Sequence, residues 1–191
     1  MHRLLFVLAS LLFVPGVFAQ SYPIDKGSYL LGGTISFSSQ GGDLFTGDGD
    51  NDRLTSVSVN PTFGYFVTPG LALGGDVQFQ KDSRGDFSST SIGIGPSIAY
   101  YFGQPATRTF PFISATVGYT YTSLSYDSGV FGSQGINGYQ FGVSGGLSHM
   151  IARNVALTGA LFYQNQTFTE DGESASGDAY GFRGGVTAFI F

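Results

Sequence analysis

The chain has 191 residues, a formal net charge of −5 and no cysteine. The acidic balance argues against a nucleic-acid partner, and the missing cysteines exclude disulfides and thiolate chemistry. Only 11% of the residues are charged, where about 25% is usual, whereas 16% are aromatic and 30 are glycine. Disorder is also excluded, because it requires low hydrophobicity and high charge.

Residues 1–19 have the features of a cleaved secretory signal peptide. Arg3 precedes an apolar run at 4–14, and the small residues Val17 and Ala19 precede an expected cut after Ala19. The run is too short to cross a bilayer as a helix, which takes about 20 apolar residues. We therefore expect an exported protein with one domain over residues 20–191.

The rest of the chain alternates apolar and polar residues with a period of two, which is typical of β-strands with one apolar face. The alternation predicts eight strands, at 28–38, 54–66, 71–81, 89–102, 110–124, 135–149, 155–168 and 178–191. Short connections at 67–70, 103–109 and 151–154 alternate with longer polar ones at 39–53, 82–88, 125–134 and 169–177. The longer connections carry most of the acidic residues, whereas Arg108 and Arg153 lie in short ones.

Two architectures fit eight alternating strands: a soluble sandwich and a membrane barrel. The sandwich needs a charged, water-facing surface, but the only charged residues in the expected strands are Asp76, Lys81, Asp178 and Arg183. A polar, nearly uncharged face suits the crowded interior of a small barrel, and an apolar face with Tyr and Phe toward its ends suits lipid. We therefore predict an all-β fold, an eight-stranded antiparallel up-and-down transmembrane β-barrel.

Two phrases, "NPTFGYFVTPGLALGGDVQF" and "GPSIAYYFG", together with the export signal and Phe191, resemble the outer-membrane β-barrel domain family. Its small eight-stranded members include the OmpA-, OmpX- and OmpW-like barrels. The resemblance implies a location in the cell outer membrane, among lipid and lipopolysaccharide. It also implies a barrel-assembly machinery that recognises a terminal aromatic strand, a role that falls here on Phe191, with Phe189 on the same face. We expect a monomer without a cofactor.

The last predicted strand contains a conflict. Its odd positions place Phe189 and Phe191 outward toward lipid, but Arg183 shares that parity, and an arginine in lipid is costly. A change of phase at Gly184 and Gly185 would turn Arg183 inward. We then expect a polar plug in the lumen, made of Asp76, Gln78, Gln140, Gln164 and Arg183.

Pro61 and Pro96 lie inside predicted strands. Each proline removes a hydrogen bond from the ladder, so we expect a local bulge at both positions.

The sequence offers few candidates for chemistry. Asp48, Asp50 and Asp52 alternate as calcium ligands can, but Arg53 and Val59 break the EF-hand pattern, which leaves only a weak metal candidate. A barrel enzyme that modifies lipid could use a serine activated by a histidine. Ser148 and His149 are adjacent, however, and adjacent strand residues face opposite sides. We expect no catalytic or cofactor-binding residues.

These observations predict a non-enzymatic outer-membrane barrel with a structural or surface-interaction role. Eight strands enclose an interior only wide enough for side chains, so the lumen is expected to be closed. The alternative is passage of small hydrophobic solutes, which requires a side opening or an apolar lumen. The expected lumen is polar, with Phe66, Tyr101 and Phe162 as exceptions. A lipid-modifying enzyme is a further, weaker alternative.

The assembly signal can be tested by replacing Phe191 with serine. Because the terminal strand carries the resemblance to the signal, Phe191→Ser should slow insertion and leave precursor in the periplasm, measured by cell fractionation. Undiminished outer-membrane levels of the variant would contradict this prediction.

Overall fold

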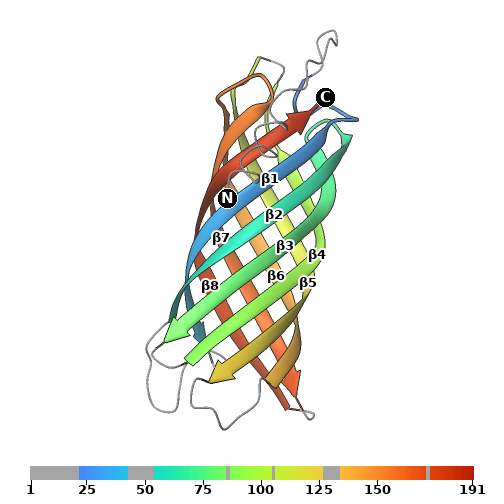
Figure 1. Ribbon diagram of the computed structural model, residues 1–191. Helices are drawn as coiled ribbons and strands as arrows, with labels where there is room; N and C mark the ends of the chain where they lie inside the picture. Colours follow the sequence, from blue (N-terminus) through green and yellow to red (C-terminus); the bar gives the residue numbers. More distant parts are fainter. Residues whose placement is uncertain (1–21, 43–53, 85–86, 105, 127–133, 171–172) are drawn as a thin grey trace, which may run out of the picture.

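The computed structural model describes residues 22–42, 54–84, 87–104, 106–126, 134–170 and 173–191. Eight strands form one closed barrel in chain order, each antiparallel to its neighbours (Figure 1): β1 (Tyr29–Gly42), β2 (Leu54–Thr68), β3 (Leu71–Arg84), β4 (Phe87–Tyr101), β5 (Thr109–Tyr126), β6 (Gln134–Met150), β7 (Val155–Glu170) and β8 (Glu173–Ile190). The predicted fold class is confirmed. Within the described ranges, no helix is long and apolar enough to cross a membrane.

The barrel closes where β1 meets β8. The two strands pair continuously from Tyr29↔Ile190 to Gly42↔Gly177. Without this seam the edges of both strands would leave rows of unpaired N–H and C=O groups, which are very costly in lipid. Closure therefore gives every strand a paired neighbour on both sides.

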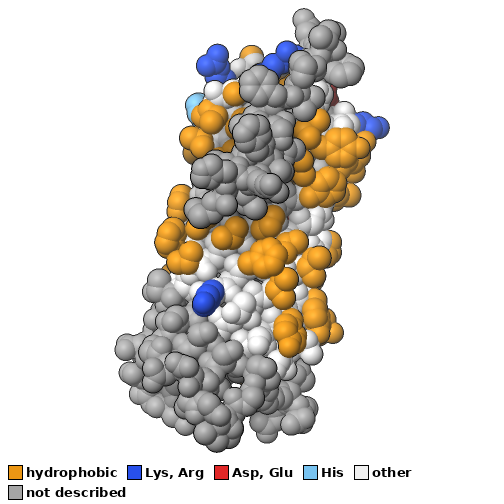
Figure 2. All heavy atoms as spheres, viewed as in Figure 1, with side chains coloured by type: hydrophobic (Ala, Val, Ile, Leu, Met, Phe, Trp, Pro, Cys, Tyr) orange, Lys and Arg blue, Asp and Glu red, His pale blue; other side chains and the backbone are white. Residues whose placement is uncertain are grey.

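The outward face is apolar. Ile94 and Leu161 have 62% and 69% of their surface exposed, far more than large apolar residues in the core of a soluble protein. Figure 2 shows hydrophobic side chains spread over the flank of the barrel. Tyrosine pairs border this belt. The ring centres of Tyr29 and Tyr65 lie 5.0 Å apart near the short turns, and those of Tyr119 and Tyr139 lie 5.9 Å apart toward the longer connections. An apolar belt between aromatic girdles is the surface that a lipid bilayer requires.

The strands run further at the long-connection end than the alternation predicted. β3 and β4 pair up to Arg84↔Phe87, and β7 and β8 pair up to Glu170↔Glu173. Most of the expected loops at 82–88 and 169–177 are therefore strand. The hydrophobic alternation fades where lipid ends, but antiparallel pairing continues beyond it.

The bulges expected at Pro61 and Pro96 are absent. Pro61 pairs with Gly33 and Pro96 with Gly75 without any inserted residue. The register on the other side of Pro61 is also unchanged from Val59↔Phe79 to Thr62↔Asp76. Each proline has no N–H group, so it donates no hydrogen bond to one of its two neighbouring strands. Its ring points outward, and the ladder therefore needs no extra residue.

The phase change expected in β8 does not occur either. Thr34↔Gly185 and Gly33↔Val186 follow in one register, so the odd residues of β8 all point inward. Arg183 is inward, as predicted, but Phe189 is inward as well and 0% exposed. The expectation that Phe189 faces lipid is wrong, because its ring packs against Phe66 and Tyr101 inside the barrel. Phe191, expected outward as well, is partly buried against the same interior cluster.

The tight β1–β8 seam can be tested with two glycines. A Cβ atom on Gly185 would collide with the carbonyl oxygen of Gly33, whereas a Cβ atom on Gly33 would meet nothing within 4 Å. Gly185→Ala should therefore lower the free energy of unfolding by about 1–3 kcal/mol, the usual cost of overpacking. Gly33→Ala, the matched control, should change it little.

Both variants can be unfolded in urea from lipid vesicles, with the gel-mobility difference between folded and unfolded barrel as the readout. Equal stability of the two variants would contradict the close approach at Gly185.

Candidate functional site in the barrel interior

Aromatic rings fill the interior at the short-turn end. We call Phe66, Tyr101, Phe110, Phe112 and Phe189 the aromatic cluster; all five are buried. The ring centres of Phe66 and Tyr101 lie 5.7 Å apart, and those of Tyr101 and Phe112 lie 5.2 Å apart. Phe189 stacks on Phe66 at 6.3 Å. The cluster joins β2, β4, β5 and β8, so it packs the cross-section of this end.

The segment before β1 covers the cluster. Ile24 is 2% exposed and packs against the rings. The backbone holds it there, because the Gly27 N–H donates to the Phe66 carbonyl at 2.9 Å and the Gly70 N–H donates to the Ile24 carbonyl at 2.8 Å. Tyr22 adds an edge contact with Phe110, at 5.7 Å between ring centres. This short-turn mouth of the barrel is therefore closed by both side chains and backbone.

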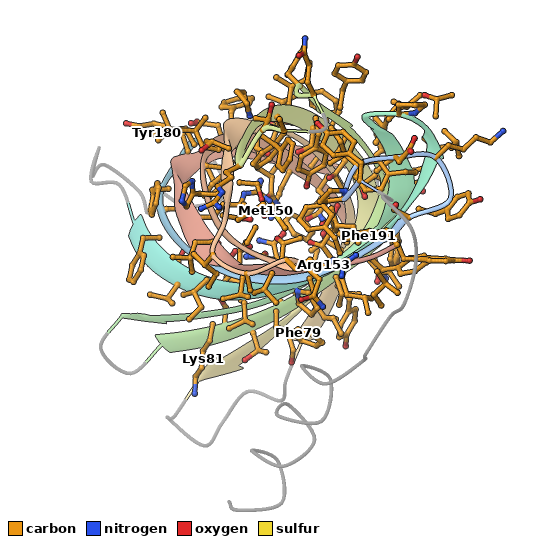
Figure 3. The ribbon with its side chains drawn as sticks, turned by 90° about the horizontal axis from the view of Figure 1, so that it is seen from above. Phe79, Lys81, Met150, Arg153, Tyr180 and Phe191 are labelled. Atoms are coloured by element: carbon orange, nitrogen blue, oxygen red, sulfur yellow. The ribbon has the colours of Figure 1, made fainter. Side chains whose placement is uncertain are left out.

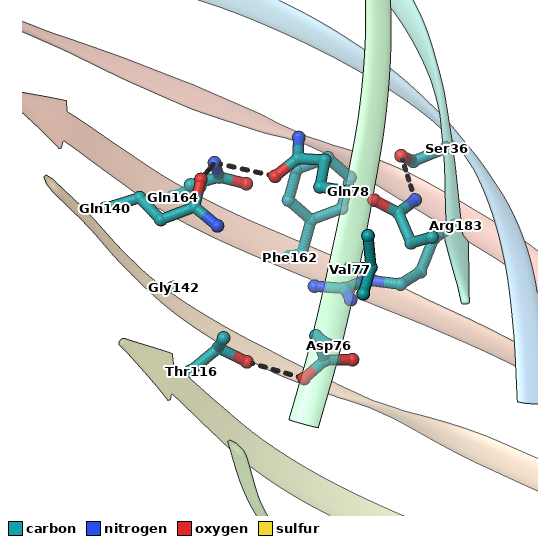
Figure 4. A pocket seen from close by; sticks show the side chains of 11 residues that line it. Ser36, Asp76, Val77, Gln78, Thr116, Gln140, Gly142, Phe162, Gln164 and Arg183 are labelled. Carbon is teal, nitrogen blue, oxygen red and sulfur yellow. Dashed lines mark hydrogen bonds between the residues drawn. The ribbon is translucent and has the colours of Figure 1, made fainter. Parts of the chain in front are cut away.

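A chain of glutamines crosses the middle of the barrel (Figure 4). The Gln164 amide donates to the Gln78 side-chain oxygen at 3.1 Å and to the Gln140 side-chain oxygen at 2.9 Å. Thr120 also donates to the Gln140 oxygen, at 2.8 Å. Since β3 and β7 are not neighbours in the sheet, the bond between Gln78 and Gln164 spans the lumen.

Arg183 and Asp76 face the same interior space but form no direct salt bridge. The Asp76 carboxylate accepts hydrogen bonds from Thr62 at 2.6 Å and Thr116 at 3.1 Å. The Arg183 guanidinium lies 4.9 Å from the centre of the Phe162 ring, and its buried Nε has no hydrogen-bond partner in the protein. The cation therefore relies on the aromatic face and on the nearby carboxylate across the space.

Together these residues leave only a small cavity. Its volume is about 40 Å³, and all five predicted plug residues line it: Asp76, Gln78, Gln140, Gln164 and Arg183. We call these five residues the polar network. A cavity of this size and polarity has room for water, which could satisfy the Arg183 Nε. The polar network and the aromatic cluster thus fill successive sections of the lumen.

The sequence placed Phe66 and Tyr101 in the lumen but missed Phe110, Phe112 and Phe189 beside them. It also missed the two threonines that hold Asp76. A signal was present, because Phe110 and Phe112 share the parity of Ser114 and Thr116 on β5 and must face the same side. The parity of β5 therefore indicates an apolar stretch of lumen at the short-turn end.

The candidates for chemistry are not brought together. Ser148 is buried and shares a hydrogen bond of 3.1 Å with Thr158, whereas His149 is exposed and lies 2.8 Å from the Thr109 hydroxyl. The two residues face opposite sides, as predicted. Asp48, Asp50 and Asp52 lie outside the described residues. Among the residues that the structure describes, no group of three or more His, Cys, Asp and Glu could hold a metal ion.

The sequence matches no family model, and no curated protein matches it at a significant level. Solved structures do match. Neisserial surface protein A has a TM-score of 0.67 at 16% identity, and the alignment covers 85% of this chain and 99% of that one. OprG from Pseudomonas aeruginosa has a TM-score of 0.56 at 13% identity, covering 89% and 99%. Ail of Yersinia pestis has a TM-score of 0.52 at 10% identity, covering 85% and 99%.

The chain has the fold of the small outer-membrane β-barrels. The resemblance seen in the sequence is thereby confirmed for the architecture. At these identities the similarity concerns the fold, so function must be argued from the interior and the surfaces of this barrel.

The coupling of Arg183 to Asp76 can be measured by a double-mutant cycle. Asp76→Asn should lower the free energy of unfolding by about 1–3 kcal/mol, because it leaves a buried cation without its nearby anion. Adding Arg183→Met should recover part of this loss, since the uncompensated charge is then gone. Urea unfolding in vesicles gives the four values, and strictly additive effects would contradict the coupling.

Proposed function

We propose that this chain is an outer-membrane β-barrel protein with a closed, non-conducting interior and no enzymatic activity. It acts in the envelope through its outer surfaces, in a structural or surface-interaction role. The observation that carries the proposal is the filling of the lumen by two different layers in series, the aromatic cluster and the polar network.

The outer-membrane location rests on three independent supports. The flank is an apolar belt bordered by tyrosines. The first 19 residues have the pattern of an export signal. The fold is shared with proteins such as OprG, whose structure is described as that of an outer membrane protein. In barrels of this kind the short turns face the periplasm and the longer connections face outward.

A closed lumen follows from how its layers are held. Water crossing the barrel would have to separate the Gln78–Gln164–Gln140 chain and then pass the aromatic cluster and Ile24. Separating the glutamines breaks bonds that a file of confined water replaces only in part, and each buried amide group left without a partner costs about 1–3 kcal/mol. Displacing a packed aromatic ring exposes a large apolar surface. The polar network opens only when its hydrogen bonds break, and the aromatic cluster opens only when its rings move apart. A single local fluctuation therefore does not open both layers.

A surface role is supported by the barrel's outer end. Paired strands extend beyond the apolar belt there, up to the Arg84↔Phe87 and Glu170↔Glu173 pairs. These strand ends form a paired sheet outside the membrane, which suits contact with other molecules. Among the similar structures, Ail is described as an attachment invasion locus protein.

Passage of small hydrophobic solutes is the competing function, and the apolar aromatic cluster is the feature that favours it. Such a solute would meet the polar network next along the lumen. It would have to displace hydrogen-bonded glutamines and approach the Arg183 guanidinium without replacing any of these polar contacts. The polar network therefore acts against this function.

Planar-bilayer recordings test the closed lumen. The wild type should show no steady single-channel current. The triple variant Gln78→Ser, Gln140→Ser, Gln164→Ser removes the glutamine chain, and the double variant Phe66→Ala, Phe189→Ala thins the aromatic cluster. Each should remain non-conducting, because the other layer persists, whereas the combined variant should give open-channel steps.

Each variant is first checked for folding by its gel-mobility shift. Reproducible channel steps from the wild-type protein would overturn the closed lumen. Uptake of a small hydrophobic dye into wild-type vesicles, above that of protein-free vesicles, would favour the competing function instead.

A further inference from the structure

The segment before β1, residues 22–28, crosses the short-turn mouth of the barrel, and we call it the strap. At its base the strap continues the pairing of β1 with β2, because the Phe66 N–H donates to the Ser28 carbonyl at 2.9 Å. At its far end Tyr22 meets Phe110 of β5, at 5.7 Å between ring centres. Since β1 and β5 lie on opposite sides of the eight-stranded barrel, the strap spans the mouth.

A glycine in the turn between β2 and β3 holds the middle of the strap. The Gly70 N–H donates to the Ile24 carbonyl at 2.8 Å, and the Gly70 carbonyl accepts from the Tyr101 N–H at 2.8 Å. Gly70 has a φ of 80°, and a Cβ atom there would lie 2.6 Å from the Tyr101 carbonyl oxygen, so the position requires glycine. This turn therefore connects the strap to β4 as well as to β2.

The side chain of Ile24 packs on the aromatic cluster, which only the closed barrel provides. Ile24 is 2% exposed and belongs to one buried group with that cluster. Met150 and Phe191 pack against the same group, and Figure 3, which looks onto this end, shows both near the mouth of the barrel. Within the cluster Phe189 of β8 stacks on Phe66 of β2, two strands that come together only when β8 pairs with β1. The packing surface for Ile24 is therefore complete only after the seam has formed.

The strap is held less firmly than the strands. Residues 22–26 belong to no strand, so they lack the continuous ladder that holds β1 and β2. The Tyr22 hydroxyl is buried without a hydrogen-bond partner in the protein, which weakens the docked state. Gly27 has a φ of 95°, a conformation that only glycine adopts easily. These features allow the strap to leave the mouth while the strands stay paired.

We propose that the strap is a latch, which closes after the barrel has closed and must open before the β1–β8 seam can open. The strap leads directly into Tyr29, which pairs with Ile190 at the short-turn end of the seam. Phe189, on the strand that would have to depart, belongs to the buried group that the strap covers. The latch adds contacts that the barrel lacks while it is forming, so it slows unfolding and leaves the folding rate unchanged.

Trypsin reports the state of the latch, because Lys26 lies in the strap and is exposed. Cleavage between Lys26 and Gly27 requires this backbone to leave the Phe66 carbonyl, so its rate measures release of the strap. The folded protein is digested in detergent micelles, where both ends are accessible, and mass spectrometry identifies the cut. Ile24→Ala should speed this cleavage roughly thirtyfold, the lower end of the effect of truncating a buried isoleucine.

Two variants serve as matched controls. Tyr22→Phe keeps the ring against Phe110 and removes only the hydroxyl that has no partner, so cleavage after Lys26 should be no faster than in the wild type. Gly185→Ala weakens the seam without touching the strap, so it should leave the same cleavage at the wild-type rate. The gel-mobility shift first shows that each variant is folded.

Urea kinetics in lipid vesicles test the order of events. Ile24→Ala should speed unfolding by roughly the same factor and change the folding rate less than about twofold. Gly27→Ala leaves every packed side chain in place but strains the backbone at the base of the strap, and should speed unfolding about fivefold.

Three results would each overturn the latch: equal cleavage of the wild type and Ile24→Ala, faster cleavage in Gly185→Ala, or slower folding of Ile24→Ala with unchanged unfolding. The outcome is independent of the closed lumen. Ile24→Ala should still pass no current, because the polar network persists, and a conducting wild type would leave the latch intact.

Discussion

Pairing of the backbone in lipid is the constraint on which the rest of this structure depends. Every strand inside a bilayer must satisfy its N–H and C=O groups on both sides, which forces β1 against β8. With eight strands the resulting cylinder is narrow. Strands meet so closely at Gly185 that a single methyl group would strike the neighbouring carbonyl. Closing eight strands therefore removes the edges and also leaves little room in the interior.

A narrow interior shielded from both water and lipid accepts two kinds of filling. Aromatic rings fill it by packing, as Phe66 and Phe189 do at the short-turn end. Polar side chains fill it only when they satisfy one another, as Gln78, Gln140 and Gln164 do. Arg183 shows the limit of the second kind, since its Nε finds no protein partner and its charge is balanced only by a ring and a carboxylate that is already hydrogen-bonded.

Sequence reasoning recovered the barrel because the lipid-facing side imposes a strict apolar alternation on every strand. It also placed Asp76, Gln78 and Gln164 in one part of the lumen, since parity and distance from the turns fix both face and height. It misplaced Phe189 because hydrophobicity alone does not separate a ring that faces lipid from one packed inside. Parity does separate them: Arg183 and Phe189 differ by an even number, so they share a face unless a bulge intervenes, and none does. The strand ends beyond the membrane escaped prediction because no lipid imposes alternation there.

Filling the lumen also decides where function can reside. A barrel whose interior is occupied by its own side chains has no binding site there for a solute. What remains for contact is the rim, the flank and the extended outer end. On the flank, Gly145 and Ala115 lie among larger residues on β5 and β6, although the backbone is not crowded at Gly145. A larger side chain at Gly145 would face lipid without crowding the backbone, so close packing within the barrel does not explain the glycine. Its consequence is an apolar trough on the outer face of the barrel, open where larger side chains would otherwise pack.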